Sequence, residues 1–410
     1  MASSIEPTAA AAPHARVIAG IRLGIAASGT RYQNRNDLTL IEIAPGATVH
    51  CLFTRNKFCA APVTIARRHW QAQAPRYLII NAGNANAGTG SAGFARALEV
   101  CTAVADAGGC LVAAVLPFST GVIGQQLNAS ALAAAAPALT ADLRSDGWDA
   151  AAAAIMTTDT RVKIRSVEVA AGGARFAVTG IAKGSGMIKP DMATMLAYVA
   201  TDAAVTPDVW RSLAGTVTDC SFNRITVDGD TSTNDALVLI ATGKSGAPCI
   251  DSDGHPLYRP LHDAIAAVCV ALAQDIVRDG EGATKFITVK VSGGQTEQDC
   301  VRVAYAVAES PLVKTALFAS DPNWGRILAA VGRAGAEHLL IADVDLAIGG
   351  LAIVRGGEPA PDYSEAAAAA IMRERDIEIA IGLGHGTASV TVWTCDFSYD
   401  YVKINAEYRS

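Results

Sequence analysis

The sequence has no surplus of positive charge and no long apolar run. Its formal net charge is −6 at pH 7 over 410 residues. A protein that binds nucleic acid electrostatically needs a basic face to displace counterions. No uninterrupted apolar stretch reaches the ~18 residues that suggest a membrane-spanning helix. We therefore expect neither a nucleic-acid-binding protein nor a membrane protein.

The nine cysteines and seven histidines also lack the short spacings of metal sites. No two cysteines form a C-x-x-C pair, and no two histidines form H-x-x-x-H. Structural zinc sites and thiol redox motifs are built on such spacings. We therefore expect no zinc site and no disulfide framework, but reduced, mostly buried thiols in a cytoplasmic protein.

Residues 1–14 contain no basic segment followed by an apolar core. They are rich in Ala, Ser and Pro and include Glu6. A secretory signal needs both the basic and the apolar region. We therefore expect a short, flexible N-terminal arm.

Apolar residues are abundant, at 51% of the chain against 18% charged residues, which is enough to fill sizeable cores. A length of 410 residues favours two or three domains. Helical periodicity and strand-like alternation occur in both halves, which predicts an α+β fold with mixed sheets covered by helices. The expected strands are residues 38–43, 77–80, 110–116, 163–170, 175–179, 235–242 and 287–291, and the expected helices are 128–154 in pieces, one beginning at Thr206-Pro207, and 261–276.

Glycine-rich turns follow two of the apolar segments. Pro117–Gly124 follows the strand expected at 110–116 and reads as a loop crowded with backbone N–H groups. Residues 377–382 and 388–394 alternate around Leu383-Gly-His-Gly386, which predicts an antiparallel hairpin.

Three polar motifs resemble ligand sites but lack part of the required pattern. Gly88-Thr-Gly-Ser-Ala-Gly93 matches G-x-G-x-x-G, yet residues 81–87 separate it from the preceding strand, whereas a dinucleotide site needs a tight turn. Asp228–Asp235 lacks the glycine position and the final glutamate of a calcium loop, so we favour a hydrogen-bonded turn. Lys183 with Gly184-Ser-Gly186 could hold a phosphate, without the full P-loop pattern. A nucleotide- or phosphate-binding regulatory protein therefore remains one alternative.

Ala193-Thr194 stands between that glycine-containing loop and an apolar segment expected to form a strand. An internal threonine hydroxyl has no base of its own. A chain-terminal threonine has one, because an α-amine with a pKa near 8 can accept the hydroxyl proton. Thr194 could create that terminus by attacking the Ala193 carbonyl, shifting the acyl group from nitrogen to oxygen, and being released by water. From composition alone, a structural threonine at the start of a strand is the simpler interpretation.

The segments Lys183-Gly-Ser-Gly-Met-Ile188 and Pro190-Asp-Met-Ala-Thr-Met-Leu196 closely resemble the self-processing segment of the ornithine acetyltransferase family, the glutamate N-acetyltransferases of the arginine pathway. The resemblance runs from about residue 15 to the C-terminus. Further matching segments, in the family's order, are residues 37–45, 53–56, 81–90, 116–124, 156–159, 280–286 and 401–405.

This resemblance implies that the chain cleaves itself between Ala193 and Thr194. The products would be an α chain, which folds over 15–193, and a β chain, 194–410, that remain associated as a heterotetramer of two α and two β chains. The resemblance also implies the layered αββα sandwich of self-processing N-terminal-nucleophile enzymes.

The resemblance further assigns roles to individual residues. Thr194 is implied as the nucleophile, with its freed amine as the base, and Thr120 and Gly121 as the oxyanion hole. Lys183 and Thr157 suit a substrate carboxylate. The implied substrate-binding positions are Thr157, Lys183, Thr194, Glu281, Asn405 and Ser410.

The reaction that follows is acetyl transfer from N2-acetylornithine to glutamate through an acetyl-threonine ester. It requires no metal or redox cofactor, and acetyl-CoA could serve as a second donor. A related alternative is an N-terminal-nucleophile aminopeptidase, which would use water as the acceptor.

Overall fold

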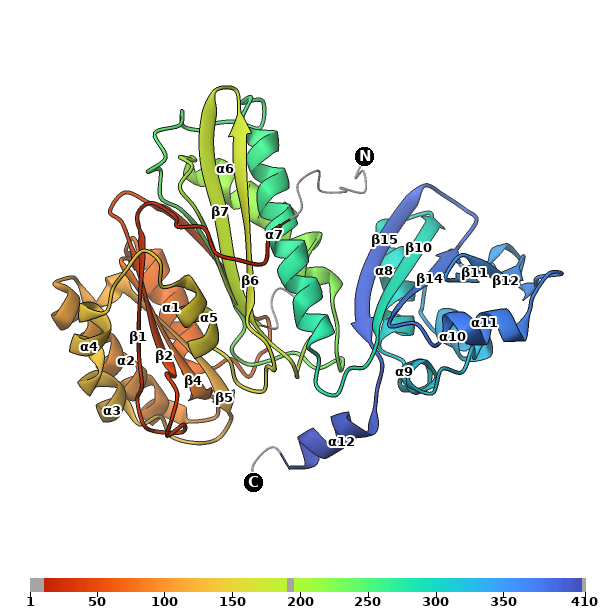
Figure 1. The fold of residues 1–410 in the computed structure, drawn as a ribbon, viewed down its shortest axis with the longest axis horizontal. Helices are drawn as coiled ribbons and strands as arrows, with labels where there is room; N and C mark the ends of the chain where they lie inside the picture. The colour runs from red at the N-terminus through yellow and green to blue at the C-terminus, as the bar shows by residue number, and fades with distance from the viewer. Residues whose placement is uncertain (1–10, 190–194, 408–410) are drawn as a thin grey trace. The chain divides into compact units, whose positions relative to one another are not determined.

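The computed structural model describes residues 11–189 and 195–407 (Figure 1). Ala193, Thr194 and Ser410 lie outside the described residues. The chain forms two compact units. We call Ile5–Asn223 with Thr231–Ile276 the sandwich unit, and Arg224–Asp230 with Val277–Ser410 the C-terminal unit. Position 193 falls inside the sandwich unit, so these units differ from the α and β chains expected after cleavage.

The first sheet of the sandwich unit has four strands in the order β1-β2-β4-β5. Its strands are β1 (Ile21–Ala26), β2 (Leu38–Ile43), β4 (Tyr77–Asn84) and β5 (Val115–Val122). Strands β1, β2 and β4 are antiparallel, whereas β4 and β5 are parallel. The alternation read from residues 38–43 is therefore a strand, as predicted.

The second sheet of the sandwich unit has five strands in the order β3-β9-β8-β7-β6. They are β3 (Thr48–Phe53), β6 (Lys163–Ala171), β7 (Ala174–Lys183), β8 (Leu196–Thr201) and β9 (Ala236–Ala241). Strand β8 pairs antiparallel with β7 and parallel with β9. The apolar segment after Thr194 is therefore a central strand.

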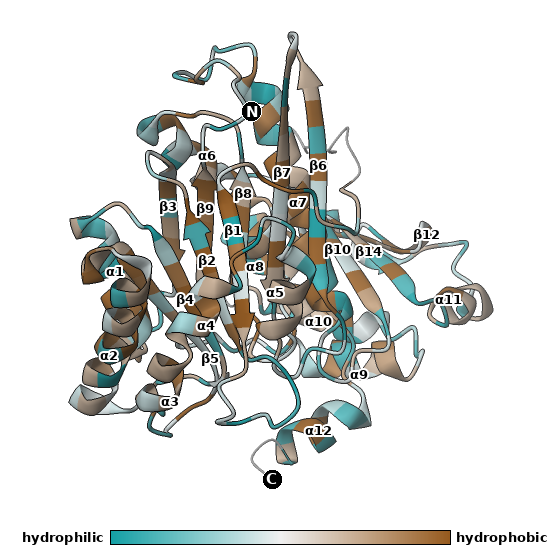
Figure 2. Cartoon of the chain, turned by 60° about the vertical axis from the view of Figure 1, so that its left-hand side comes forward, coloured by the Kyte–Doolittle hydropathy of each residue, from teal (hydrophilic) through white to brown (hydrophobic). Residues whose placement is uncertain are grey.

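Alternate side chains of the two sheets meet in one core. Ile41, Leu78 and Phe118 of the first sheet belong to the same buried cluster as Tyr198 and Val238 of the second. Each fully buried large apolar side chain contributes about 1.5–3 kcal/mol relative to an exposed one. Figure 2 shows the predominantly hydrophobic colouring of β9 and β4.

Helices cover the outer faces of both sheets. Leu40 and Ile79 of the first sheet pack with Val100 of α2 and Leu139 of α4. On the second sheet, Trp210 of α6 donates from its indole Nε1 to the Leu239 carbonyl at 3.1 Å. The helices of this unit are α1 (Ala61–Ala72), α2 (Gly90–Gly108), α3 (Ala129–Ala134), α4 (Ala136–Ala141), α5 (Trp148–Ala154), α6 (Pro207–Asp219) and α7 (Tyr258–Arg278), whose last two residues belong to the C-terminal unit. The unit thus has the predicted αββα layers (Figure 1).

Helix α7 is, among the described residues, the one helix long and apolar enough to cross a membrane by length and composition. Its Val268 and Leu272 pack against Gly180 of β7, where an added Cβ would come within 2.9 and 3.0 Å of their side chains. Because 67% of its apolar window is buried, we interpret α7 as a core helix of the sandwich unit.

The C-terminal unit is a six-stranded sheet with helices packed on it. The strand order is β13-β12-β11-β14-β10-β15, and Val289, Ile379 and Val392 contribute to one buried cluster with Val303 and Ile327 of the helices. Its elements are β10 (Phe286–Gly294), α8 (Glu297–Ala308), α9 (Pro311–Phe318), α10 (Trp324–Gly332), β11 (Asp345–Ile348), β12 (Leu351–Arg355), β13 (Glu358–Pro359), α11 (Glu365–Ile371), β14 (Asp376–Gly382), β15 (Ala388–Cys395) and α12 (Tyr399–Ala406).

The hairpin predicted at 377–394 is wrong. Both strands exist, but β10 lies between them, parallel to β14 and antiparallel to β15. The connecting turn passes over the end of β10, where the Leu383 N–H donates to Ser292 and the His385 N–H to Gly293. The alternation is the same whether two strands pair with each other or with a third strand between them, so the sequence could not distinguish these arrangements.

Candidate active site

Three strands of the sandwich unit have aligned ends next to Met195, the residue that follows Thr194 in the sequence. Lys183, the last residue of β7, is in register with Leu196, the first residue of β8, and Leu196 is in register with Ala236 of β9. The Ala236 N–H also donates to the Met195 carbonyl at 2.9 Å. The chain that follows Thr194 is therefore paired with a strand on each side, β7 and β9, from its first described residues.

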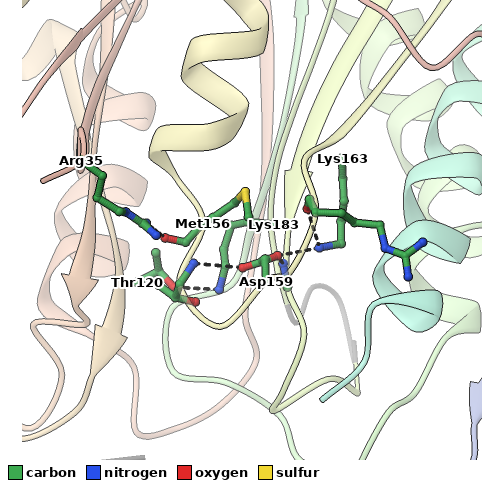
Figure 3. Close-up of polar contacts among 9 residues, drawn as sticks. Arg35, Thr120, Met156, Asp159, Lys163 and Lys183 are labelled. Atoms are coloured by element: carbon green, nitrogen blue, oxygen red, sulfur yellow. Dashed lines mark hydrogen bonds and ion pairs between the residues drawn. The ribbon is translucent and has the colours of Figure 1, made fainter. Parts of the chain in front are cut away.

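Lys183 connects this end of the second sheet to the first sheet. Its ammonium donates to Thr120 Oγ1 over 3.1 Å, and both side chains are buried (Figure 3). An ammonium has no lone pair to offer, so Thr120 acts only as the acceptor in this bond. The hydroxyl proton of Thr120 is consequently directed elsewhere, as an oxyanion donor requires.

Gly121 occupies a backbone position that a larger residue could not adopt. Its φ is +130°, and an added Cβ would lie 2.2 Å from the carbonyl carbon of Gly83 on β4. The ladder between β4 and β5 is irregular here, at Gly83 and Asn84. The loop predicted from residue 117 is therefore mostly strand, since β5 runs to Val122. Such irregularities often occur next to active sites.

Asp159 holds the segment that contains Thr157 next to Lys163 and Gly184. Its carboxylate accepts hydrogen bonds from Lys163 Nζ at 2.7 Å, the Gly184 N–H at 2.7 Å and the Thr157 N–H at 3.0 Å. Burial would raise the pKa of Asp159, but the positive charges of Lys183 and Lys163, with these hydrogen bonds, hold the pKa below its ordinary value. Asp159 is therefore ionised and fixes the backbone beside Thr157 and Lys183.

An arginine from another part of the unit supports the same segment. Arg35 donates to the carbonyl of Met156, the residue before Thr157 (Figure 3). Its guanidinium lies 4.0 Å from the centroid of the Tyr32 ring. The half-buried Thr157 is thus held between an arginine contact on one side and Asp159 on the other.

Asp235 is a second buried carboxyl group, next to the start of β9. Its side chain is 3% exposed, and Oδ2 has no hydrogen-bond partner among the described residues. Burial raises the pKa of Asp235 well above its usual value, and the hydrogen bonds from Ser232 and the charge of Lys183 lower it by less. A buried polar atom without a partner costs about 1–3 kcal/mol.

Glu281 and Asn405 lie in the C-terminal unit. The Asn405 side chain, on α12, donates to Glu281 Oε2 at 2.9 Å and to the Tyr401 carbonyl at 3.0 Å. Glu281 is 7% exposed. The pair predicted to bind substrate is thus joined directly, and residues 399–406 form a helix rather than a frayed tail.

The predicted residues therefore fall into two groups. The sandwich unit brings Thr120 and Gly121 together with Lys183, and Asp159 joins Thr157 to the same network. The C-terminal unit pairs Glu281 with Asn405. Sequence interpretation gave no role to Asp159, Lys163 or Asp235, although Asp159 and Lys163 have the four-residue spacing of a local ion pair.

The remaining polar motifs form internal contacts. At the G-x-G-x-x-G match, Asn86 bonds through its side chain to Thr89 and to the Gly93 carbonyl. In the acidic segment, the Asp230 N–H donates to Asp228, as expected for a hydrogen-bonded turn. Within residues 11–189 and 195–407, no group of three or more His, Cys, Asp or Glu side chains could hold a metal ion. All nine cysteines are free thiols.

Comparisons with known proteins agree along almost the whole chain. The ArgJ family profile matches residues 22–410. The arginine biosynthesis bifunctional protein ArgJ of Psychrobacter arcticus is 55% identical, over 96% of this chain and 97% of that protein. The protein of the same name from Pseudomonas fluorescens is 50% identical, over 97% and 98%.

A solved structure is also similar. The crystal structure of the arginine biosynthesis bifunctional protein ArgJ from Bacillus halodurans is 41% identical with a TM-score of 0.50, and the match covers 52% of this chain and 100% of that one. The profile match and both bacterial relatives extend across the αββα unit and the C-terminal unit alike. This chain therefore belongs to the ArgJ family and is an acyltransferase of arginine biosynthesis.

Proposed function

We propose that this enzyme transfers an acetyl group from N2-acetylornithine to glutamate, with Thr194 as the nucleophile after cleavage between Ala193 and Thr194. One observation carries the proposal. Lys183 bonds to Thr120 and is in register with Leu196, and Thr194 precedes Leu196 by two residues. An oxyanion donor, a cation and the start of the nucleophile's strand therefore meet at one end of the sandwich unit.

The first half-reaction forms an acetyl ester. Thr194 Oγ attacks the acetyl carbonyl, and the free α-amine of Thr194 accepts the hydroxyl proton. Thr120 O–H and the Gly121 N–H stabilise the oxyanion. The amine then returns the proton to the nitrogen of ornithine, which leaves as the carbon–nitrogen bond breaks.

In the second half-reaction the α-amino group of glutamate attacks the ester. Its proton passes to the Thr194 amine and then to Thr194 Oγ, so that N-acetylglutamate leaves and the enzyme is restored. Lys163 and Lys183 both act on the single ionised carboxylate of Asp159. Because the cluster is left with a net positive charge, it favours a substrate that carries a carboxylate. Glu281 with Asn405 suits an ammonium group, and we assign Ser410 to substrate binding with them.

The architecture supports lasting association of the cleaved chains. Residues 174–183 and 196–201 are neighbours in one sheet, so the α and β chains would share that sheet after cleavage. The matched chain of the Bacillus halodurans protein corresponds to about half of this one, the ratio expected if a relative is present as two chains. We propose a cytoplasmic heterotetramer of two α and two β chains, with no metal or redox cofactor. Two relatives are named bifunctional proteins, and for this chain we propose acetyl-CoA as a second donor.

A denaturing gel with intact-mass measurement tests this proposal. The wild-type protein should give two fragments that divide at 193/194, whereas Thr194→Ala should give one full-length chain without transferase activity. Thr102→Ala, at an exposed position of α2, is the matched control and should split like the wild type. Splitting at 193/194 in Thr194→Ala would contradict the proposal. Rapid hydrolysis of acetylornithine, unaffected by glutamate, would favour the aminopeptidase instead.

A further inference from the structure

The loop that carries Glu281 lies against the start of α12, the helix that carries Asn405. The backbone of Gly282 has a φ of +69°, and an added Cβ there would lie 2.4 Å from the Tyr401 nitrogen and 2.8 Å from Ser398 Oγ. Glycine alone tolerates both this backbone conformation and so close an approach. The two segments are therefore in direct contact beside the pair of side chains proposed to bind substrate.

The Ser398 hydroxyl joins these two segments. It donates to the Gly282 carbonyl at 2.6 Å, and it accepts the Asp400 N–H at 3.2 Å as the N-cap of α12. Ser398 is buried, so water does not readily take over either bond. A single hydroxyl therefore links the residue after Glu281 to the first turn of α12.

Helix α12 depends on contacts at its N-terminal end. None of its eight residues, all within the described part of the chain, is buried. Two ring contacts hold its first turn: Tyr401 stacks on Phe397 with centroids 4.6 Å apart, and Tyr399 contacts Phe318 edge-on at 5.4 Å. Isolated helices this short are unstable in water, so the position of Asn405 follows from how the beginning of α12 is fixed.

The far end of the Glu281 loop is anchored by the residue that follows β15. Asp396 is fully buried, and its carboxyl group accepts the Thr284 N–H at 2.8 Å, the Lys285 N–H at 2.9 Å and the Thr284 hydroxyl at 2.5 Å. Ser398 bonds to the residue next to Glu281, whereas Asp396 bonds to residues three and four positions away. Ser398 therefore has the more direct influence on the Glu281 side chain.

We propose that Ser398 is a positioning residue for substrate recognition, whose hydroxyl holds Glu281 and Asn405 in the geometry that binds the side-chain ammonium of N2-acetylornithine. This role rests on the function proposed above. Asn405 donates to Glu281 Oε2 at 2.9 Å and so sets the direction of that carboxyl group. Asn405 is exposed, which places the pair at the solvent boundary. Charge-assisted hydrogen bonds are short and directional, so a shift of Glu281 relative to Asn405 weakens the contact with the ammonium.

The test compares N2-acetylornithine with N2-acetylnorvaline, which has the same carbon skeleton without the ammonium, as acetyl donors to glutamate. The ratio of their kcat/KM values measures recognition of the ammonium, and a reduced fraction of folded enzyme lowers both values alike. Threonine and glycine are about equally good N-caps, but only threonine keeps a hydroxyl. The ratio should fall roughly 3–10-fold in Ser398→Gly, on the order of one lost hydrogen bond, and should stay near the wild-type value in Ser398→Thr. Ser398→Ala is a second removal variant, assessed in the same way if the Gly variant does not fold.

Ser364→Gly is the matched control. Ser364 is an exposed N-cap in the same unit, whose hydroxyl accepts the Ala367 N–H at 3.3 Å at the start of α11, and its variant should keep the wild-type ratio. An unchanged ratio in a folded Ser398→Gly or Ser398→Ala protein would overturn the role of Ser398, as would an equal fall in Ser398→Thr or Ser364→Gly.

Glu281→Gln separates this role from the function on which it rests. A wild-type ratio in that variant would remove ammonium recognition by Glu281, and with it the role of Ser398. A lowered ratio in Glu281→Gln together with an unchanged ratio in the Ser398 removal variants would overturn the role of Ser398 alone and leave the proposed function in place.

Discussion

Replacing Asp159 by Asn should destabilise the sandwich unit strongly, because this carboxylate compensates a buried charge. The side chains of Asp159 and Lys163 are both fully buried, and their charged atoms are 2.7 Å apart. Asp159 also accepts the backbone N–H groups of Thr157 and Gly184. Asparagine keeps the size and one acceptor oxygen, but it removes the negative charge that lies 2.7 Å from the buried Lys163 ammonium.

Removing one partner of a buried ion pair costs about 3–5 kcal/mol, a large part of the roughly 5–15 kcal/mol that stabilises a typical domain. The matched control is Asp208→Asn, which breaks the 3.1 Å ion pair with Arg211 on α6. Those side chains are 91% and 65% exposed, so this loss should be within about 1 kcal/mol. Urea denaturation followed by circular dichroism measures both changes. A change below 1 kcal/mol for Asp159→Asn would refute the assigned role.

The pH dependence of this difference provides an independent check. The pKa of Asp159 is depressed in the folded protein relative to about 3.9 in an unfolded chain. Its stabilising contribution is therefore complete above the unfolded pKa and is lost as the pH falls through the lower folded value. The gap between the wild type and Asp159→Asn should be constant from pH 6 to 8 and should shrink in acid below about pH 4. A gap that grows on acidification would contradict an ionised Asp159.

Three further predictions concern catalysis. Thr120→Ala should slow acetyl transfer by roughly 10²–10³-fold, the cost of one oxyanion donor, and near-normal kcat would restrict the role to backbone N–H groups. Gly121→Ala should reduce both activity and the urea midpoint, because its Cβ would lie 2.2 Å from the Gly83 carbonyl carbon; an unaffected variant would disprove the backbone requirement. With acetylornithine alone, the β chain should gain about one acetyl mass (~42 Da) on Thr194, which glutamate discharges, and initial rates should be ping-pong; intersecting rate lines with an unlabelled chain would mean direct transfer.

Local patterns predicted individual elements well and their partners poorly. The spacing of apolar residues over 261–276 identified α7, and alternation identified β2. The loop predicted from Pro117 is instead part of β5, an edge strand paired in parallel with β4. Proline is tolerated in edge strands, and long-range pairing overrides the weak strand propensity of Ser and Gly.

For the candidate site, residues could likewise be named from the sequence, whereas their contacts and their burial could not. Family resemblance identified Thr120 and Lys183, but their hydrogen bond joins residues 63 positions apart, which no local pattern reveals. Asp235 ends an acidic, hydroxyl-rich segment that has the composition of a solvated turn. Its burial results from the strand that follows, because Ala236 begins the fully buried β9. An acidic side chain directly before an apolar strand was the available signal.

The position of the proposed cleavage site explains how one peptide bond could be broken without separating the fold. Strands β7 and β8, which flank it, share six register pairs, and β8 also pairs with β9 along its length. Tyr198 and Ile181 extend into the core between the two sheets. The ladder hydrogen bonds and this apolar contact do not depend on the 193–194 bond. Cleavage would therefore create a free amine two residues before Leu196, the first residue of β8, and leave these contacts in place.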